Sequence, residues 1–383
     1  MNDLAHDLGR GAAGALVHHG VLAQGSGVWT AAHAAARTMA GQAATVDPSS
    51  GSLYRGAPAV AYALHTAGHR AYRSALNELD RKIGPHIAAR LSAAHLRMDS
   101  GQPPRMREYD LIRGLTGLGA YLLRRETRPD LLDGVLRYLV RLLQQPVTVQ
   151  GHSLPGWWTL DSPHGEPDDR WPLGHGNFGM AHGVAGPVAL LALCSRAGHT
   201  VPGQHETLVG ACRLLEGWLR PLADGGDAWP ETTTVNEWLD GPSPRACLGR
   251  PSWCYGTPGV ARSLQLAALA CGRTGSQHRA EDALLSCISD TRQLDRLQDA
   301  TVCHGWAGVC LATCTAAAEA APGTALTDRL AALRSAFAAY MAENALPRDA
   351  GLLTGADGIL LTTHTLEPTH HVGPGWETCL LLN

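Results

Sequence analysis

The sequence predicts an all-α fold, and three observations support this prediction. A short glycine pattern, Gly-x-x-Gly or a close variant of it, occurs seven times along the 383 residues. Each copy is followed by a run of small aliphatic residues, which is typical of a helix that is buried on all sides. The segments between the copies have the apolar spacing of amphipathic helices, and little of the chain alternates as a strand does.

The copies of the glycine pattern mark the expected starts of seven repeated helices. Glycine permits a close backbone approach and a positive φ just before a helix begins. Ala59 occupies the second glycine position of the second copy. Pro187 and Pro258 lie just inside two of the expected helices, where the missing N–H has no cost. The copies occupy residues 11–14, 56–59, 114–117, 183–186, 256–259, 305–308 and 355–358.

The segments between the copies are expected to form outer helices with one side in solvent. Residues 131–143 and 329–340 have this periodicity, whereas Pro, Gly and Asp cluster in the expected loops at 155–172 and 221–251. A hairpin with one fully buried helix cannot shield itself, so such units must pack against one another. They can stack as an open solenoid or close into a ring with the apolar helices inside. A protein of two helical domains is the third alternative.

Composition and charge exclude several classes of protein. Hydrophobic residues make up 45% of the chain and charged residues 17%, so a large core is expected and disorder is not. The formal net charge is −3 and no basic run occurs, which argues against nucleic acid as a partner. No basic region precedes an apolar core at the N-terminus, and the apolar stretch around 184–194 is too short to span a membrane. We therefore expect a soluble, cytoplasmic protein without a transmembrane segment.

All ten cysteines lie in the second half of the chain, from Cys194 onward. In a long chain without an export signal they are expected to be reduced. Cys254 and Cys303 lie just before the first glycines of two neighbouring copies, and His304 follows Cys303. If the repeats are equivalent in space, two thiols and an imidazole meet at one end of the fold, a donor set that suits zinc. The alternative, small buried cysteines, stays open for this pair because no Cys-x-x-Cys motif is present. We interpret the other eight cysteines as ordinary structural residues: Cys194, Cys212, Cys247, Cys271, Cys287, Cys310, Cys314 and Cys379.

Other chemically active side chains precede the glycines of the same or nearby copies. His182 and Tyr255 stand directly before the first glycine of their copies, and Asp110 and Arg250 stand four and six residues before theirs. A lone histidine is more often structural than catalytic. Because His182 occupies a repeat-equivalent position beside the expected ligands, we treat a catalytic and a structural role as equal alternatives. Solvated or paired charges remain the alternative for Asp110 and Arg250.

Three motifs, taken in order, resemble the lanthionine synthetase C-like family of lanthipeptide cyclases. They are Gly-Asn-Phe-Gly-Met-Ala-His-Gly-Val-Ala-Gly at 176–186, Trp-Cys-Tyr-Gly-Thr-Pro-Gly at 253–259 and Cys-His-Gly-Trp-Ala-Gly at 303–308. The ordered set is far more specific than any one motif, and the resemblance covers essentially the whole chain. Residues 109–117 and 376–382 are also similar to family segments, although Glu377 stands where the family usually has Asp.

The resemblance implies an α/α toroid, a double ring of seven inner and seven outer helices, as one domain over residues 1–383. It implies a zinc-dependent enzyme that adds peptide cysteine thiols to dehydroalanine or dehydrobutyrine and forms lanthionine or methyllanthionine rings. No kinase, lyase or dehydratase region precedes the ring, so a separate dehydratase is expected to supply a dehydrated precursor peptide with its leader. The implied zinc ligands are Cys254, Cys303 and His304. The implied catalytic residues are His182 as acid/base, Asp110 as its assistant, and Arg250 and Tyr255 near the reacting groups.

Two other functions remain as alternatives. The first is addition of glutathione to dehydroamino acids in damaged proteins, which a pocket lined by Lys and Arg would favour. The second is a non-catalytic zinc scaffold that holds a biosynthetic complex together. The presence of His182, Asp110 and Arg250 argues against the scaffold.

Overall fold

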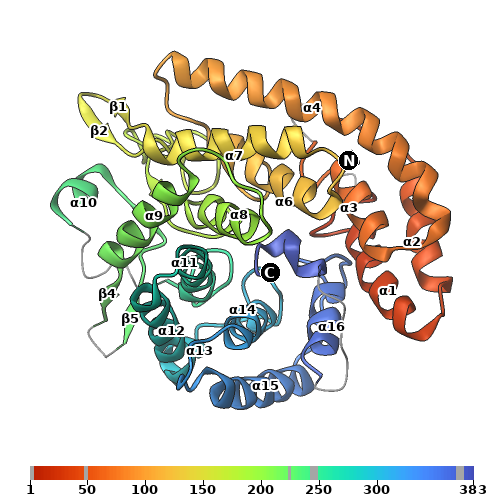
Figure 1. Ribbon diagram of the computed structural model, residues 1–383. Helices are drawn as coiled ribbons and strands as arrows, with labels where there is room; N and C mark the ends of the chain where they lie inside the picture. Colours follow the sequence, from red (N-terminus) through yellow and green to blue (C-terminus); the bar gives the residue numbers. More distant parts are fainter. Residues whose placement is uncertain (1–3, 47–50, 223–225, 242–248, 368–374) are drawn as a thin grey trace.

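The computed structural model describes residues 4–46, 51–222, 226–241, 249–367 and 375–383, so Cys247 lies outside the described residues. Within them helices dominate, as predicted, and each strand has only two or three residues (Figure 1). None of the described helices is long and apolar enough to cross a membrane. The strands pair antiparallel: β1 (Val147–Val149) with β2 (His152–Leu154), β3 (Gly176–Asn177) with β6 (Thr232–Thr233), and β4 (Arg220–Pro221) with β5 (Asp227–Ala228).

A ring of helices surrounds the centre of the molecule (Figure 1). Each begins one or two residues after the first glycine of one copy, which confirms the expected helix starts. Each contacts the next in chain order, and α16 contacts α1, so the ring closes and the open solenoid is excluded. These inner helices are α1 (Ala12–Ser26), α3 (Ala57–Ala67), α6 (Leu115–Arg125), α8 (Ala185–Arg196), α11 (Thr257–Cys271), α14 (Trp306–Ala318) and α16 (Ala356–Thr365).

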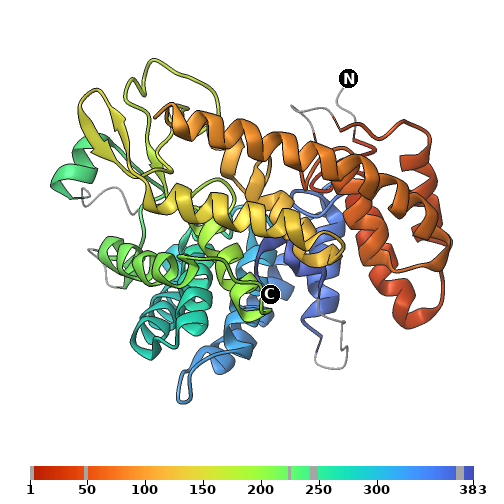
Figure 2. The same cartoon turned by 45° about the horizontal axis from the view of Figure 1, so that its top comes forward.

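Outer helices pack against the inner ring and bury only one side. In α15, for example, Leu326, Leu330, Leu333 and Phe337 are buried at helical spacing. Neighbouring outer helices also touch, as α4 and α7 do along one side of the molecule (Figure 2). They are α2 (Thr30–Ala40), α4 (Arg73–Asp99), α7 (Pro129–Gln144), α9 (Gln204–Trp218), α12 (Thr274–Ser289) and α15 (Leu326–Glu343). Shorter elements are η1 (Arg70–Tyr72), α5 (Met106–Tyr109), α10 (Val235–Asp240) and α13 (Thr291–Leu294).

The expected seventh outer helix is not found among the described residues. After α16, the next described element is the short 3-10 helix η2 (Trp376–Leu380). It fills the centre of the ring instead of covering its outside (Figure 1). The inner ring therefore follows the sequence prediction more closely than the outer ring does.

Most repeat glycines are needed because the neighbouring backbone leaves no room for a Cβ, and not because their φ is positive. Among the first glycines of the copies, only Gly56 has a positive φ, of 71°, so that part of the expectation was wrong elsewhere. A Cβ on Gly259 would lie 2.0 Å from the carbonyl oxygen of Trp253, and one on Gly308 would lie 2.0 Å from that of Val302. Each helix thus packs directly on the loop that leads into it, which fixes the residues of that loop.

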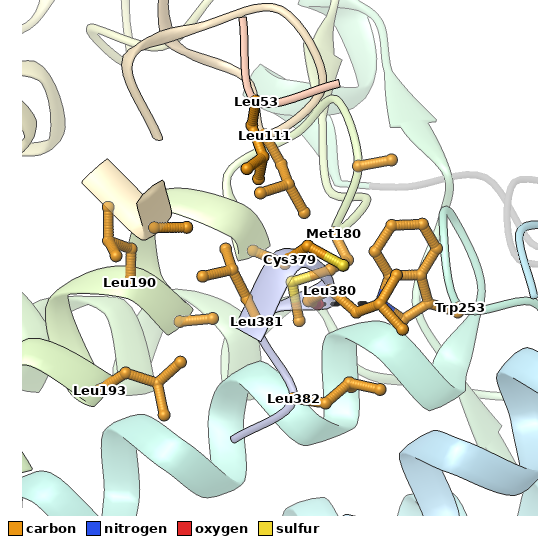
Figure 3. Packing of buried hydrophobic residues seen from close by; sticks show 14 of the residues in the cluster. Leu53, Leu111, Met180, Leu190, Leu193, Trp253, Cys379, Leu380, Leu381 and Leu382 are labelled. Atoms are coloured by element: carbon orange, nitrogen blue, oxygen red, sulfur yellow. Dashed lines mark hydrogen bonds between the residues drawn. The ribbon is translucent and has the colours of Figure 1, made fainter. Parts of the chain in front are cut away.

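The segment after α16 is held in the centre of the ring by hydrogen bonds from the inner helices and their loops. The Trp253 indole donates to the Leu380 carbonyl at 3.1 Å, and the Arg262 guanidinium donates to the Leu382 carbonyl at 2.7 and 2.9 Å. Leu380, Leu381 and Leu382 are fully buried, with Met180 and Trp253 nearby (Figure 3). Side chains therefore fill the centre of the ring, which is not an open pore.

The first and last inner helices are joined by a hydrogen bond between an imidazole and a carboxylate. His18 Nδ1 of α1 lies 2.8 Å from Asp357 Oδ1 of α16, and the Gly351 N–H donates to the other oxygen of Asp357 at 2.8 Å. Both side chains of the pair are nearly buried. This contact joins residues 339 positions apart and closes the ring at its seam.

Candidate active site

The loops that precede the inner helices meet at one end of the ring. Backbone hydrogen bonds join several of them in chain order. The Leu111 N–H donates to the Ala181 carbonyl, and the Ala181 N–H donates to the Cys254 carbonyl, each at 3.1 Å. The Cys303 N–H donates to the Leu353 carbonyl at 2.9 Å. The repeat-equivalent positions therefore gather as the sequence predicted.

Two thiols and an imidazole form a compact group at this end. One ligand atom from each of Cys254, Cys303 and His304 lies within 4.8 Å of the others. Cys254 Sγ is 3.2 Å from His304 Nδ1, and it also lies 3.4 Å from Ser252 Oγ. Cys254 is buried, and Cys303 and His304 are half-buried. This set of soft sulfur and nitrogen donors fits zinc, which prefers such ligands in tetrahedral sites.

The electrostatics of this group favour a thiolate at Cys254. A hydrogen bond from the Cys303 thiol, followed by contact with His304, holds the pKa of Cys254 well below its ordinary range despite its burial. The same contact with Cys254 raises the pKa of His304 above its ordinary value. The pKa of Cys303 is raised, first by its hydrogen bond to Cys254. Thiolate is the form of cysteine that binds metals, so the group is suited to its expected role.

His182 and Asp110 form a second group beside the first. His182 Nδ1 lies 2.6 Å from Asp110 Oδ2. The Asp110 side chain is buried and its other oxygen accepts from the Arg113 N–H at 2.6 Å, so its position is fixed. The His182 side chain is 28% exposed. A buried carboxylate that holds one imidazole nitrogen sets the orientation of this partly exposed ring.

Tyr255 and Arg250 lie near these groups. The Tyr255 ring is 6.0 Å from the His182 ring, and its hydroxyl donates to the Pro163 carbonyl at 3.4 Å. Burial raises the pKa of Tyr255 well above its usual range, so the phenol stays protonated at neutral pH. Arg250 is exposed, and its positive charge acts on Cys303 and His304. The structure thus brings all seven predicted site residues to the same end of the ring.

Two further residues belong to this neighbourhood and were missed in the sequence. Ser252 contacts Cys254 Sγ and also accepts from the Tyr255 N–H at 3.4 Å. Glu231 is half-buried next to Arg250, and burial followed by the charge of Cys254 raises its pKa. Ser252 could have been found from its place two residues before Cys254. Glu231 carries no such signal, because it reaches the site from a loop outside the repeats.

Comparison with known proteins agrees with this architecture. The model of the lanthionine synthetase C-like protein family matches residues 4–381. The nisin biosynthesis protein NisC of Lactococcus lactis subsp. lactis is 26% identical over 273 residues, which cover 68% of this chain and 60% of NisC. A solved structure named nisin cyclase has the same fold, with a TM-score of 0.80 and 21% identity, covering 100% of this chain and 93% of that one. Because the family model spans almost the whole sequence, the chain belongs to the lanthionine synthetase C-like family.

Proposed function

We propose that this protein is a zinc-dependent lanthipeptide cyclase. It adds the thiol of a peptide cysteine to a dehydroalanine or dehydrobutyrine of the same peptide and forms thioether rings. The observation that carries the proposal is the placement of the Cys254, Cys303 and His304 group beside the His182–Asp110 pair. Membership of the family and similarity to a nisin biosynthesis protein support the same chemistry.

Cys254, Cys303 and His304 would hold the zinc, because three protein ligands leave a fourth tetrahedral position free. When bound, zinc supplies the positive charge that keeps a coordinated peptide thiol deprotonated. A free thiol with a pKa of ~8.5 is only about 3% ionised at pH 7. Full ionisation therefore contributes only about 30-fold, or about 2 kcal/mol, and the rest of the acceleration must come from the protein.

The side chains of this site are suited to the remaining steps. As the sulfur bonds to the β-carbon, the π electrons move to the carbonyl oxygen and give an enolate. Arg250 is proposed to stabilise that negative charge. His182, oriented by Asp110, then delivers a proton to the α-carbon. The thiol proton lost and the carbon proton gained balance, so the product is an isomer of the dehydrated peptide.

We propose further that the enzyme acts in the cytoplasm, where its own thiols and those of the substrate stay reduced. The substrate would be a precursor peptide with its leader, already dehydrated by a separate enzyme. The reaction supports these proposals, because it needs a free thiol and a preformed dehydroamino acid.

The zinc ligands are tested by substitution and metal analysis. Cys254→Ala, Cys303→Ala and His304→Ala are each expected to reduce bound zinc and to abolish cyclisation of a dehydrated peptide. Because cyclisation leaves the mass unchanged, free thiols are alkylated before mass spectrometry, and only uncyclised thiols gain mass. Full zinc retention in all three variants would overturn the ligand assignment.

The acid/base role is tested separately from metal binding. His182→Ala is expected to keep zinc and fold while losing correct ring formation, because the α-carbon lacks its proton donor. His278→Ala, on the exposed side of α12, is the matched control and should retain both properties. Intermolecular glutathione adducts without ring formation would favour the glutathione alternative. Zinc-loaded protein that leaves every substrate thiol open to alkylation would favour the non-catalytic scaffold.

A further inference from the structure

We propose that a row of arginines on the site end of the ring binds the carboxylates of an acidic segment in the peptide substrate. This inference rests on the proposed function, because it takes the substrate to be a peptide. It concerns the N-terminal half of the rim, which holds none of the expected zinc ligands. We call this surface the arginine rim and define it by Arg10, Arg55, Arg107 and Arg113.

The repeat pattern places three of these arginines at equivalent positions. Arg10, Arg55 and Arg113 each stand directly before the first glycine of their copy, and all are exposed. The same position in later copies holds His182, Tyr255 and His304. Equivalent positions therefore carry the proposed chemistry on one half of the rim and cationic side chains on the other.

Hydrogen bonds and an ion pair link the loops that carry the arginine rim. Asp7 joins the first two arginines, because its carboxylate lies 3.3 Å from Arg55 Nε and accepts from the Arg10 N–H at 2.8 Å. Arg90 on α4 bridges to the next loop, because one of its nitrogens donates to the Gly51 carbonyl at 3.4 Å and the Arg113 carbonyl at 2.7 Å.

The arginine rim reaches the proposed acid/base pair directly. The Arg113 N–H donates to Asp110, and Asp110 in turn holds His182. A peptide lying along these arginines would therefore pass the His182–Asp110 pair.

A cleft beside α4 gives this surface depth. It has a volume of about 380 Å³ and its lining includes Arg90, Arg105, Arg107, Arg113 and Glu108. The one lining carboxylate, Glu108, is already paired with Arg97 at 2.6 Å. Among the described residues, no carboxylate pairs with the exposed side chains of Arg107 and Arg113.

These features favour carboxylates as the bound groups. A guanidinium presents paired N–H groups that match the two oxygens of a carboxylate. Asp110 is buried and accepts a backbone N–H, whereas Asp7 is buried and pairs with Arg55. The unpaired positive charge of the rim therefore lies on Arg10, Arg107 and Arg113 among the described residues. An extended peptide with several carboxylates would therefore find separate, unpaired cations along its path.

Direct binding tests the inference. Fluorescence anisotropy of the full-length protein is measured with a labelled peptide of alternating Glu and Ser, and with its Gln and Ser analogue. The acidic peptide is expected to bind more tightly, and raising salt from about 50 to about 300 mM should weaken it as screening increases. Equal binding of both peptides would overturn the proposal.

Substitution locates the binding surface. The double variant Arg107→Gln/Arg113→Gln is expected to weaken acidic-peptide binding about fivefold, the scale of two exposed ion pairs. The control Arg213→Gln/Arg279→Gln removes two exposed arginines from the outer helices α9 and α12 and should change nothing. If both double variants lose the same affinity for the acidic peptide, binding depends only on the net charge of the protein, which would contradict its assignment to the arginine rim. An oligonucleotide that displaces the peptide at equal charge concentration would mark a general polyanion surface and would also contradict it.

The binding assay is independent of the proposed reaction. Cys303→Ala, which is expected to lose zinc and activity, should bind the acidic peptide as the parent does. Selective binding by a protein that cyclises no dehydrated peptide would defeat the proposed function alone. Unselective binding by a protein that cyclises peptides would defeat this inference alone.

Discussion

His175 shows how one buried side chain makes stability depend on pH. It is fully buried, its Nδ1 donates to the Asp161 carbonyl at 2.8 Å, and among the described residues its Nε2 has no hydrogen-bond partner. Burial lowers the pKa of His175 from 6.5 to about 4, because the charged ring would lose its hydration. Between these values the unfolded chain binds more protons than the folded one. Stability present above pH 6.5 is therefore lost as pH falls toward 4.

We expect His175 to remove about 2 kcal/mol from the free energy of unfolding at pH 5 relative to pH 7.5. His175→Asn keeps an N–H for the Asp161 carbonyl but does not titrate, so its stability should fall less on acidification. Urea unfolding at the two pH values measures the difference. His278→Asn, an exposed histidine change on α12, should leave the parent's pH dependence intact. A parent-like slope in His175→Asn would refute this explanation.

At the residue scale, the repeat register explains which site residues could be predicted. Cys254 and Cys303 stand two residues before repeat glycines, and His182 stands directly before its own, so the sequence alone places them together. Glu231 has no such register, because its approach depends on the path of a loop between α9 and α11. Arg10, Arg55 and Arg113 share the repeat register, but the sequence could not show that their side chains stay exposed or that Arg107 lies beside Arg113.

At the element scale, each inner helix is fixed by contact with the loop that precedes it. The second glycine of a copy lies against a carbonyl of that loop, as Gly308 does against Val302. The sequence predicted that the backbone passes close to these glycines. It did not predict that most first glycines have an extended backbone, which depends on how neighbouring loops pack. Ala59 shows that one copy accepts a methyl group at this position, and the first glycine of that copy, Gly56, has a positive φ.

Gly259→Ala and Gly308→Ala are each expected to destabilise the protein by about 1–3 kcal/mol, because the new Cβ would overlap a carbonyl oxygen. Each change also displaces a loop that carries an expected zinc ligand. Thermal and urea unfolding measure the loss. Gly210→Ala, in the middle of α9 with nothing within 4 Å of its Cβ, should instead stabilise the protein by up to about 1 kcal/mol. Similar effects from all three substitutions would rule out the contact as the cause.

At the scale of the whole molecule, the ring depends on the segment at its centre. Arg262 is 1% exposed and holds this segment through the Leu382 carbonyl, while it also pairs with Gln265 and Glu319. The sequence predicted a ring from its repeats, but it could not predict this central packing. The sequence does not indicate which groups a buried arginine in an apolar helix will contact.

Arg262→Leu is expected to destabilise the fold by about 3–5 kcal/mol, because the partners of a buried cation lose their hydrogen bonds. Amide hydrogen exchange should rise most in residues 376–382, and thermal unfolding should shift to lower temperature. Arg213→Leu removes an exposed arginine from α9 and should shift neither measurement appreciably. Unchanged exchange in residues 376–382 of Arg262→Leu would show that the segment is held by other contacts.

The central position of residues 376–382 also sets the order in which the molecule can be completed during synthesis. All seven inner helices leave the ribosome before the segment that packs between them. The partners His18 and Asp357 are 339 residues apart, which at about 5–20 residues per second separates their appearance by tens of seconds. Until residues 376–382 follow, the sides of the inner helices that face the centre lack the segment that packs against them. Burial of these sides is therefore incomplete until the last residues of the ring's centre have been synthesised.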